Sequence, residues 1–278
     1  MNHFLKRRSN IILNIILMLL LLLTIYPFFF TLMTSFKDNG QFYKQFWALP
    51  NPFVMSNYES AIAKILPYIG NSLIISVASI TGVLTFASMA AYAFARLRFP
   101  LKDFLFASVL ALLMIPSLLQ LIPRFLILRD LHLLDSYFGI VLGYLAGQMS
   151  FSIFIIRSFF DSQPEELFEA ARLDGCKEYQ AFYKIAIPLI KPVLGTVAIV
   201  VLLAVWNDYL WPLVVTTDPS MFTIAVGLMQ FKAVFQDTTV EWGPVFAGYV
   251  VSAAPLVILF FFMMNSFIEG LTAGAIKM

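Results

Sequence analysis

The chain has 278 residues, of which 60% are hydrophobic, 16% aromatic and only 12% charged. Soluble domains are about 45–50% apolar and about 25% charged, so this composition excludes an ordinary soluble protein and indicates a membrane protein. The formal net charge of +2 offers no basic excess for binding nucleic acid. One cysteine and two histidines give no support for a disulfide, a zinc site or a haem site, so we expect no cofactor bound by this chain.

Six apolar segments are long enough to cross a bilayer as helices, which takes about 20 residues each. They are residues 11–33, 71–95, 104–126, 137–159, 193–215 and 246–267. Hydrocarbon cannot satisfy an open backbone, and the segments lack the alternation of barrel strands, so the predicted fold is an all-α membrane protein with six transmembrane helices. The first segment follows a basic cluster, as in a signal peptide, but no small-residue cleavage site ends it, and we expect an uncleaved span.

The distribution of Lys and Arg predicts the orientation. If the N-terminus lies inside, twelve of the 18 Lys and Arg fall in inner connections. The positive-inside rule then places both termini in the cytoplasm. The resulting organisation is a cytoplasmic N-terminus (1–10), a first span (11–33), an outer loop (34–70), a core of five spans (71–267) with a long inner loop (160–192), and a cytoplasmic tail (268–278).

The inner loop between the fourth and fifth spans contains a helix-start signal. Ser162 followed by Glu165 has the form of a capping box, and Pro164 suits the first turn of a helix. Gly175 suits the end of this helix. Pro188 is expected to break a second amphipathic stretch before the fifth span begins.

One face of the predicted inner helix combines small and acidic residues. Helical spacing places Leu167, Ala170, Ala171 and Asp174 together, beside acidic neighbours. A helix lying in the lipid headgroups is the alternative, but such a helix usually carries Lys and Arg on its polar face and bulky apolar residues opposite. The composition therefore favours docking into another protein.

The spacing within this loop resembles the EAA loop of permease subunits in binding-protein-dependent ABC importers. Residues 169–171 read Glu-Ala-Ala, glycine follows at 175, and residues 185–188 read Ile-Ala-Ile-Pro, with Ile187 where the family pattern has Leu. Further segments extend the resemblance over nearly the whole chain, most closely to the second permease subunit of maltose-type carbohydrate importers. These segments are residues 71–73, 91–96, 115–116, 122–123, 134–136, 206–208 and 270–277.

The resemblance implies a coupling helix over residues 165–175 that sits in a cleft of a cytoplasmic ATPase. It assigns ATPase coupling to Glu165, Glu166, Glu169, Ala170, Ala171, Asp174 and Gly175, and a C-terminal ATPase contact to Gly274, Ala275, Ile276 and Lys277. The implied partners are a homologous companion permease, an ATPase dimer that uses ATP and Mg, an extracytoplasmic solute-binding protein, a sugar and the membrane lipid. The implied location is the inner membrane of a bacterial or archaeal cell.

Catalytic motifs are missing from the sequence. It contains no G-x-x-x-x-G-K-[ST] P-loop, no H-E-x-x-H and no G-x-S-x-G. We therefore expect that the chain is not an enzyme and that a separate ATPase supplies the energy.

The fifth span carries polar residues within the membrane, in the stretch Trp-Asn-Asp-Tyr-Leu-Trp-Pro at residues 206–212. Pro212 cannot donate to the carbonyl of Asp208 and is expected to disturb the helix there. Intramembrane ionisable groups usually face the bundle interior or water, and aromatic rings beside amide and carboxyl groups suit a sugar. The predicted substrate pathway comprises Trp206, Asn207, Asp208 and Tyr209.

Other readings of these residues remain open. The aromatic residues of this stretch also suit an interfacial belt, which is favoured for Trp211. Gln120 of the third span, between possible kinks at Pro116 and Pro123, is a further pathway candidate or a structural residue. Four charged residues near the outer end of the third span are expected to be interfacial anchors, namely Arg124, Arg129, Asp130 and Asp135.

The outer connection at residues 216–243 is too aromatic for an idle linker, and it is expected either to contact the solute-binding protein or to fold back as a lid. The function predicted from the sequence is half of the translocation pathway of an ATP-driven sugar importer. The alternatives are a self-sufficient secondary carrier and an ABC permease for an amino acid or peptide. A carrier usually shows inverted repeats and several ion-coupled acids, which this chain lacks.

Overall fold

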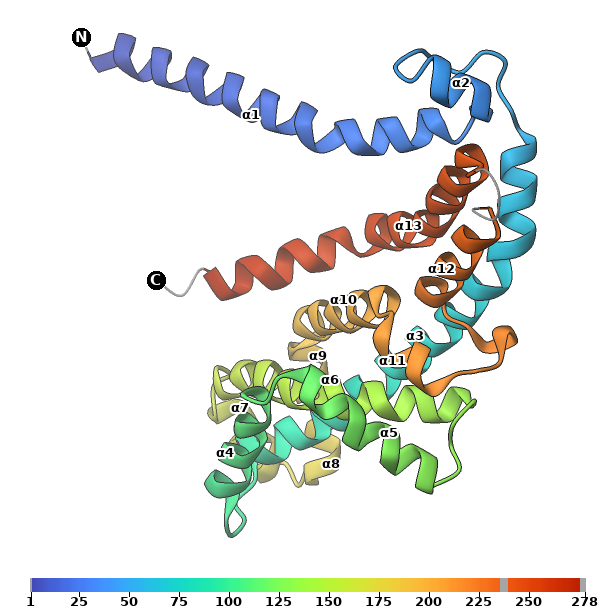
Figure 1. Cartoon of the computed structure of the whole chain (residues 1–278). Coiled ribbons are helices and arrows are strands. Elements are labelled where there is room, and N and C mark those ends of the chain that lie inside the picture. The colour runs from blue at the N-terminus through green and yellow to red at the C-terminus, as the bar shows by residue number, and fades with distance from the viewer. Residues whose placement is uncertain (1, 236–239, 276–278) are drawn as a thin grey trace. The chain divides into compact units, whose positions relative to one another are not determined.

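The computed structural model describes the backbone of residues 2–235 and 240–275, and the side chains of residues 12–235 and 240–261. Within these ranges every regular element is helical, and no strand occurs (Figure 1). The predicted all-α class is confirmed. The chain forms two compact units: unit 1 comprises Met1–Leu66 and Leu228–Leu256, and unit 2 comprises Pro67–Gly227 and Val257–Met278.

Unit 1 holds the N-terminal helix and the outer connection that follows it. Its elements are α1 (Asn2–Thr34), α2 (Asn39–Lys44), the first turns of α3 (Ser56–Arg96), the last turns of α12 (Ile224–Val234) and the first part of α13 (Trp242–Ala275). The most apolar stretch of α1, within Ile12–Thr34, buries none of its residues inside the chain. Such a helix needs lipid or another protein around it.

A buried lysine organises the connection after α1. The Lys37 ammonium, only 2% exposed, donates to the carbonyls of Gln45 and Phe46 at 3.2 and 2.7 Å. Burial lowers the pKa of Lys37. The Asn57 amide donates to the carbonyls of Ser35 and Lys37, at 2.9 and 3.0 Å. This part of the predicted outer loop is therefore an ordered structure.

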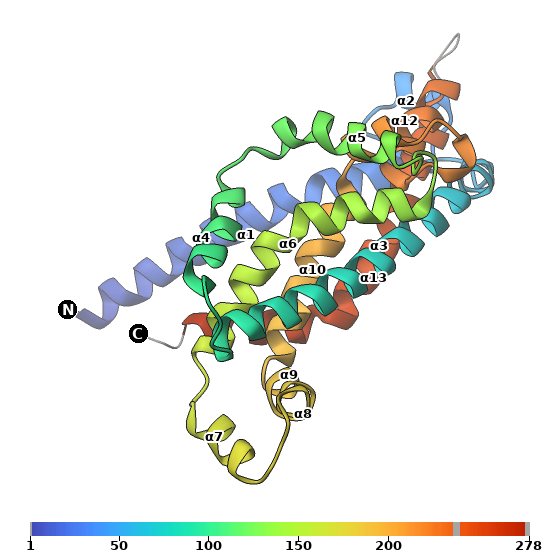
Figure 2. The same ribbon diagram turned by 90° about the horizontal axis from the view of Figure 1, so that it is seen from below.

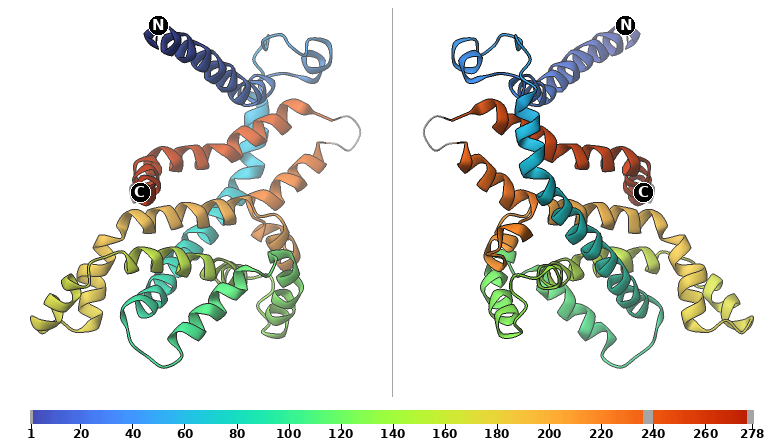
Figure 3. Two further views of the ribbon diagram at one scale, coloured as in Figure 1. Left: turned by 90° about the vertical axis from the view of Figure 1, so that its left-hand side faces the viewer. Right: turned by 90° about the vertical axis from the view of Figure 1, so that its right-hand side faces the viewer.

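Unit 2 contains the main hydrophobic core. Its elements are the rest of α3, α4 (Lys102–Leu113), η1 (Ser117–Gln120), α5 (Leu121–Asp130), α6 (Tyr137–Asp161), α7 (Glu166–Leu173), α8 (Glu178–Ala181), η2 (Phe182–Ala186), α9 (Ile187–Leu189), α10 (Lys191–Asn207), α11 (Leu210–Val215), η3 (Pro219–Met221) and the adjoining parts of α12 and α13. α3, α6 and α10 lie side by side, as Figures 2 and 3 show. Between them they bury Ile75, Val83, Ile156, Val197 and Val201.

Four helices in the described ranges are long and apolar enough to cross a bilayer, namely parts of α1, α3, α6 and α13. Two bent pairs also pass this test: α4 with the segment Ser117–Asp130, at 102°, and Glu178–Leu189 with α10, at 76°. If each bent pair is one span, the described part of the chain has up to six.

The second predicted span differs most in its bounds, and the third and fifth are interrupted close to the prolines that were expected to disturb them. α3 begins at Ser56, fifteen residues before the predicted start of the second span. The third span is interrupted at Met114 to Pro116, and the fifth at Asp208, where the backbone is extended. The cause is the missing N–H of Pro116 and of Pro212, which removes one bond of the helical ladder. Pro123 lies in the first turn of α5, where proline is tolerated without a kink.

The inner loop also differs in detail. The predicted break near Pro188 occurs two residues later at Ile190, where the chain turns into α10. η2 is a π-helix, and its wider turn lies where the Pro188 ring and missing N–H disturb the helical ladder.

Candidate functional site

α7 lies with α8 at one end of unit 2 (Figure 2). The predicted capping box at its start is wrong, because Ser162 closes the last turn of α6 and donates to the Phe159 carbonyl at 2.8 Å. α6 runs through Asp161, which leaves Ser162 at its C-terminus. Glu165 occupies the N-cap position of α7 without a side-chain capping bond.

The predicted end of this helix at Gly175 is confirmed. The Cys176 N–H donates to the Ala171 carbonyl at 2.9 Å, and the Gly175 N–H donates to the Arg172 carbonyl at 3.0 Å. This pair of bonds is a Schellman motif. Gly175 has a φ of +78°, and a Cβ built there would meet nothing within 4 Å. The backbone conformation, rather than crowding, favours glycine at this position.

The two sides of α7 differ in burial. Phe168 and Ala171 are buried, and the Phe168 ring centroid lies 6.3 Å from that of Tyr92 on α3. Ala171 therefore does not belong to the exposed face that helical spacing predicted. The exposed side presents Glu166, Leu167, Glu169, Ala170, Leu173 and Asp174.

A buried arginine at the end of α3 joins α7 to the rest of unit 2. The Arg96 side chain is 5% exposed, and its guanidinium donates to the carbonyls of Phe160 and Gln163 at 2.5 and 2.7 Å. It also pairs with the Glu165 carboxylate and lies 4.3 Å over the Phe168 ring. One side chain thus fixes the end of α6 and the start of α7.

A second arginine connects α7 with α8. Arg172 Nε lies 2.9 Å from the Glu178 carboxylate, and its Nη1 lies 3.4 Å from Glu165. The hydrogen bond to Glu178 is the main cause that raises the pKa of Arg172. The Tyr92 hydroxyl donates to Glu178 at 2.9 Å. Arg96, Arg172, Tyr92 and Glu178 form what we call the α7 seat, and none of them was among the site residues predicted from the sequence.

The second candidate region is the break between α10 and α11. Asp208 Oδ1 accepts hydrogen bonds from the backbone N–H groups of Leu210 and Trp211, at 3.0 and 3.4 Å. The carboxylate therefore stabilises the start of α11 as a cap does. The disturbance predicted at this point from Pro212 is confirmed.

A cavity of about 360 Å³ lies beside this break. We call it the α5–α11 cavity, and it is lined by Ser117, Leu118, Leu121, Arg124, Asp208, Leu210 and Trp211. Its charged groups come from the segments predicted as the third and fifth spans, Arg124 from α5 and Asp208 from the α10–α11 break. The Tyr144 hydroxyl is buried close to the Asp208 carboxylate.

Arg124 is held from two sides within this region. Its guanidinium pairs with the Gln120 side-chain oxygen and lies 3.5 Å from the Gly143 carbonyl of α6. The Gln120 amide in turn donates to the Ile115 carbonyl at 3.1 Å, across the bend of the third span. Arg124 was expected to be an interfacial anchor, but the structure places it in the cavity wall. The 102° bend between α4 and the following segment explains the difference.

The other predicted pathway residues point in different directions. Trp206 is 4% exposed and packs inside unit 2, Tyr209 is half-buried, and Asn207 is exposed with its amide bonded to the Leu203 carbonyl of its own helix. The belt prediction for Trp211 is wrong. Its ring is buried against Gly143, and its indole N–H donates to the Ile140 carbonyl at 3.0 Å.

Asp135 holds the chain segment that follows α11 in unit 2. Its carboxylate accepts from the backbone N–H and the hydroxyl of Thr217, at 2.5 and 2.7 Å, and from the Asp218 N–H at 3.1 Å. The Thr217 backbone bond is the largest cause that holds the pKa of Asp135 below its usual value. Asp135 therefore holds the loop at Thr217 and Asp218 by hydrogen bonds and does not serve as an interfacial anchor.

The predicted C-terminal contact lies partly outside the described residues. The backbone of Gly274 and Ala275 belongs to α13, whereas Ile276 and Lys277 lie outside the described residues. Among the described side chains, no group of three or more His, Cys, Asp or Glu is placed to hold a metal ion. What the two regions offer chemically is ion pairs and hydrogen bonds.

Comparison with known proteins adds a family match. Residues 83–272 match the family described as binding-protein-dependent transport system inner membrane component. The chain is 33% identical over 261 residues to the arabinooligosaccharides transport system permease protein AraQ of Halalkalibacterium halodurans, covering 92% of each. It is 31% identical over 256 residues to the diacetylchitobiose uptake system permease protein NgcG of Streptomyces coelicolor, covering 91% of this chain and 84% of the relative.

A solved structure shares the fold. A chain of a bacterial ABC transporter involved in the import of the acidic polysaccharide alginate has a TM-score of 0.84 at 24% identity, covering 94% of this chain and 97% of that one. At this identity the likeness supports the fold alone.

Proposed function

Since the chain belongs to the family of binding-protein-dependent transport system inner membrane components, we propose that it forms half of the translocation pathway of an ATP-driven sugar importer. As a member of this family it is a multi-pass permease subunit and not itself the catalyst. The proposal adds a homologous companion permease, which supplies the other half, and a cytoplasmic ATPase dimer that uses ATP and Mg.

The observation that carries the sugar assignment is the α5–α11 cavity. A helix break inside a membrane segment leaves backbone groups that need a cavity or a neighbouring helix, and secondary transporters commonly bind solutes at such breaks. Arg124 and Asp208 offer donors and acceptors with no net formal charge, and apolar side chains such as Leu121 complete the wall. This combination suits a neutral ligand with many hydroxyl groups. The relatives named for oligosaccharides support the same class.

The topology in this proposal has six spans, with each bent pair counted as one, and both termini in the cytoplasm. The excess of Lys and Arg in the inner connections supports it. In this orientation α7 lies on the cytoplasmic side, between the fourth and fifth spans.

The exposed face of α7 is the proposed ATPase contact. An ATPase moves a membrane bundle only through a contact whose free energy differs between two states. A short helix transmits such motion when its own base is rigid, and the α7 seat supplies that base through Arg96 and Arg172. The C-terminal residues Gly274 to Lys277 are proposed as a further ATPase contact.

The test of coupling uses Glu169→Lys and Gly175→Trp. Both alter the exposed face or the end of α7, and we expect each to lose ATPase co-purification and uptake while membrane insertion continues. Glu59→Lys, which inverts an exposed charge at the start of α3, is the matched control. It should retain both uptake and ATPase co-purification. Wild-type uptake and co-purification in both α7 variants would refute the coupling role.

The test of substrate class is ATP turnover by the reconstituted importer with its solute-binding protein. Oligosaccharides are expected to stimulate turnover, whereas amino acids and peptides are not. The isolated chain in vesicles with an ion gradient tests the secondary-carrier alternative, and solute uptake by it would overturn the whole proposal.

The solute-binding protein is proposed to contact the outer connection at residues 216–243. Met229 and Val234 of α12 are exposed there and offer an apolar contact. Photocrosslinking from position 229 to the ligand-loaded binding protein is expected. Crosslinks confined to a control position at Leu101, which is exposed at the start of α4, would contradict this assignment.

A further inference from the structure

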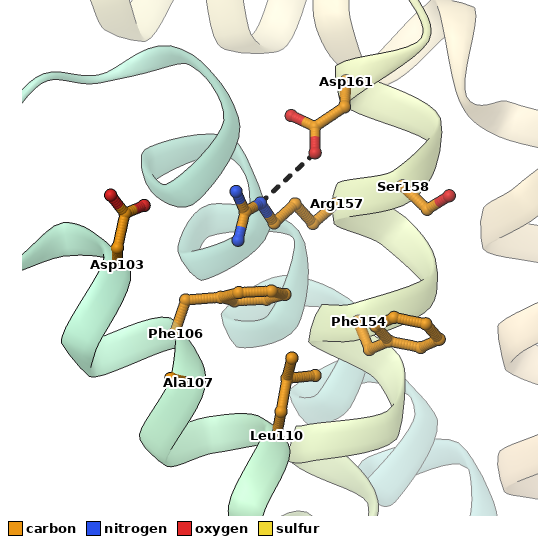
Figure 4. Close-up of a pocket in the computed structure, with 8 residues that line it drawn as sticks. All are labelled: Asp103, Phe106, Ala107, Leu110, Phe154, Arg157, Ser158 and Asp161. Atoms are coloured by element: carbon orange, nitrogen blue, oxygen red, sulfur yellow. Dashed lines mark ion pairs between the residues drawn. The ribbon is translucent and has the colours of Figure 1, made fainter.

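A second cavity, of about 450 Å³, lies between α4 and α6 of unit 2 (Figure 4). It is separate from the α5–α11 cavity and shares none of its lining residues. Its walls include the apolar side chains of Phe106, Leu110 and Phe154, and its polar rim consists of Asp103, Arg157 and Asp161. We call it the α4–α6 cavity.

In the proposed six-span topology, on which this inference rests, the rim lies at the depth expected for lipid headgroups. Asp161 is the last residue of α6, and Asp103 is the second residue of α4, so both carboxylates mark the same end of two membrane segments. Arg157 lies one helical turn deeper, where a long basic side chain extends its charged end toward the interface. Charged and apolar surfaces therefore meet here as they do in a phospholipid.

Arg157 is only partly satisfied within the chain. Its guanidinium carbon lies 3.7 Å from the centroid of the Phe106 ring, and its Nε lies 3.3 Å from the Asp161 carboxylate. The side chain is 18% exposed. Figure 4 shows its two terminal nitrogens directed toward α4. These nitrogens form a fork of the kind that binds a phosphate oxygen pair.

Asp103 supplies the opposite charge across the cavity. Its side chain projects from the first turn of α4 at the rim of the cavity (Figure 4) and is exposed. No ion pair of Asp103 occurs among the described residues. One guanidinium with two carboxylates gives the rim a formal charge of −1, which disfavours a purely anionic headgroup. A purely cationic ligand would leave the fork of Arg157 empty.

We propose that the α4–α6 cavity binds a zwitterionic phospholipid of the phosphatidylethanolamine class. The phosphate accepts hydrogen bonds from Arg157, and the ammonium group donates to Asp103. The acyl chains lie along the apolar surface beside the cavity, where Phe104, Leu105 and Phe154 are exposed within the chain. The proposal rests on the membrane location of the chain and does not depend on its substrate or on α7.

The experiment measures lipid retained by the full chain in its assembled importer, purified from nanodiscs with equal amounts of phosphatidylethanolamine and phosphatidylglycerol. Mass spectrometry is expected to find phosphatidylethanolamine enriched at least threefold on the wild type. Arg157→Gln is expected to abolish this enrichment. Asp103→Asn removes only the ammonium partner and is expected to shift the preference toward phosphatidylglycerol.

Arg129→Gln is the matched control, since Arg129 is an exposed arginine paired with Asp130 away from the cavity, and it should leave the enrichment unchanged. Free phosphoethanolamine carries the phosphate and the ammonium group without the acyl chains. At millimolar concentration it would displace the lipid from a site that binds only phosphate, and we expect no displacement. Equal amounts of the two lipids on the wild type, or unchanged enrichment in both cavity variants, would overturn the proposal. Asp103→Asn retains the Arg157–Asp161 pair, so its result stands even if Arg157→Gln fails to assemble.

Discussion

The α7 seat and the α5–α11 cavity both contain arginine and carboxylate groups, but they use them differently. Around α7, Arg96 and Arg172 pair with Glu165 and Glu178 and with backbone carbonyls. Beside the α10–α11 break, Arg124 and Asp208 line a cavity, and no ion pair joins them among the described residues.

This difference separates charges that stabilise the fold from charges that are available to bind a ligand. A charge that pairs with carboxylates and carbonyls of the chain itself, as Arg96 does through both terminal nitrogens, fixes local geometry and has little hydrogen-bonding capacity left for a ligand. A charge beside a cavity, with part of its hydrogen-bonding capacity unused, is free to bind one. Variants of the first kind should therefore change stability, and variants of the second kind should change uptake.

The largest expected effect is on stability, from Arg96→Gln. The variant leaves the carbonyls of Phe160 and Gln163 without their charged donor. Because hydrogen bonds to charged groups are the stronger ones, the free energy of unfolding should fall by about 2–3 kcal/mol. The unfolding temperature in detergent should be several degrees lower than that of the wild type. Arg98→Gln, at an exposed arginine two residues away, is the control and should unfold like the wild type. Equal unfolding temperatures for the two variants would remove the distinction between the regions.

Gly143→Ala tests the packing behind the cavity. A Cβ at this position of α6 would overlap the Trp211 ring, and overpacking of this kind costs about 1–3 kcal/mol. The matched control is Gly70→Ala in α3, where nothing lies within 4 Å and the helix gains from alanine. Unfolding temperatures are expected to fall for the first variant and to hold or rise for the second. A stable Gly143→Ala protein with normal uptake would contradict the close contact.

Asp208 combines both kinds of role, because its carboxylate accepts the first N–H groups of α11 and also lines the cavity. Asp208→Asn retains an oxygen that accepts from the Leu210 N–H but removes the charge, so stability should hold while uptake falls roughly tenfold, about 1.4 kcal/mol. Asp208→Ala should lower both. Uptake kinetics and unfolding measured on the same preparations separate the two roles. Normal uptake by Asp208→Asn would show that the carboxylate serves only as a cap.

Asp135→Asn should have the smallest effect, since its exposed hydrogen bonds contribute less than about 1 kcal/mol. Because folding lowers the pKa of Asp135, its contribution is present above the unfolded value of about 3.9 and is lost as the pH falls through the folded value. Hydrogen exchange at the Thr217 and Asp218 amides should therefore accelerate in the wild type on going from pH 6 to pH 3, once corrected for intrinsic exchange rates. Asp135→Asn should show little such change. The same pH response in the variant and the wild type would show that Asp135 does not hold these amides.

The α7 region shows how far local patterns reach. Pro164 and Gly175 predicted a short helix with a glycine end, and the Schellman motif confirms that end. The start was wrong because α6 continues to Asp161, which local capping preferences do not reveal. Arg96 was missed because it lies 69 residues from Glu165 in sequence, and only the packing of α3 against α7 brings them together.

The residues of the α5–α11 cavity were likewise only partly predictable from local sequence patterns. Asp208 and Gln120 were selected because polar residues inside apolar segments are costly, and both lie in or beside the cavity wall. Arg124 was assigned to the membrane interface because its distance along a straight helix places it there. The bend at Pro116 redirects that part of the chain.

Residues close together in the chain were enough to predict the membrane class, the helical segments, the disturbance caused by Pro212 and the glycine end of α7, whereas the break near Pro188 lies at Ile190 and Pro123 causes none. The tertiary structure decided which charges are paired, which aromatic rings are buried and which polar groups share a cavity. Those properties depend on distances between residues far apart in sequence, and the bends at Pro116, Asp208 and Ile190 set those distances.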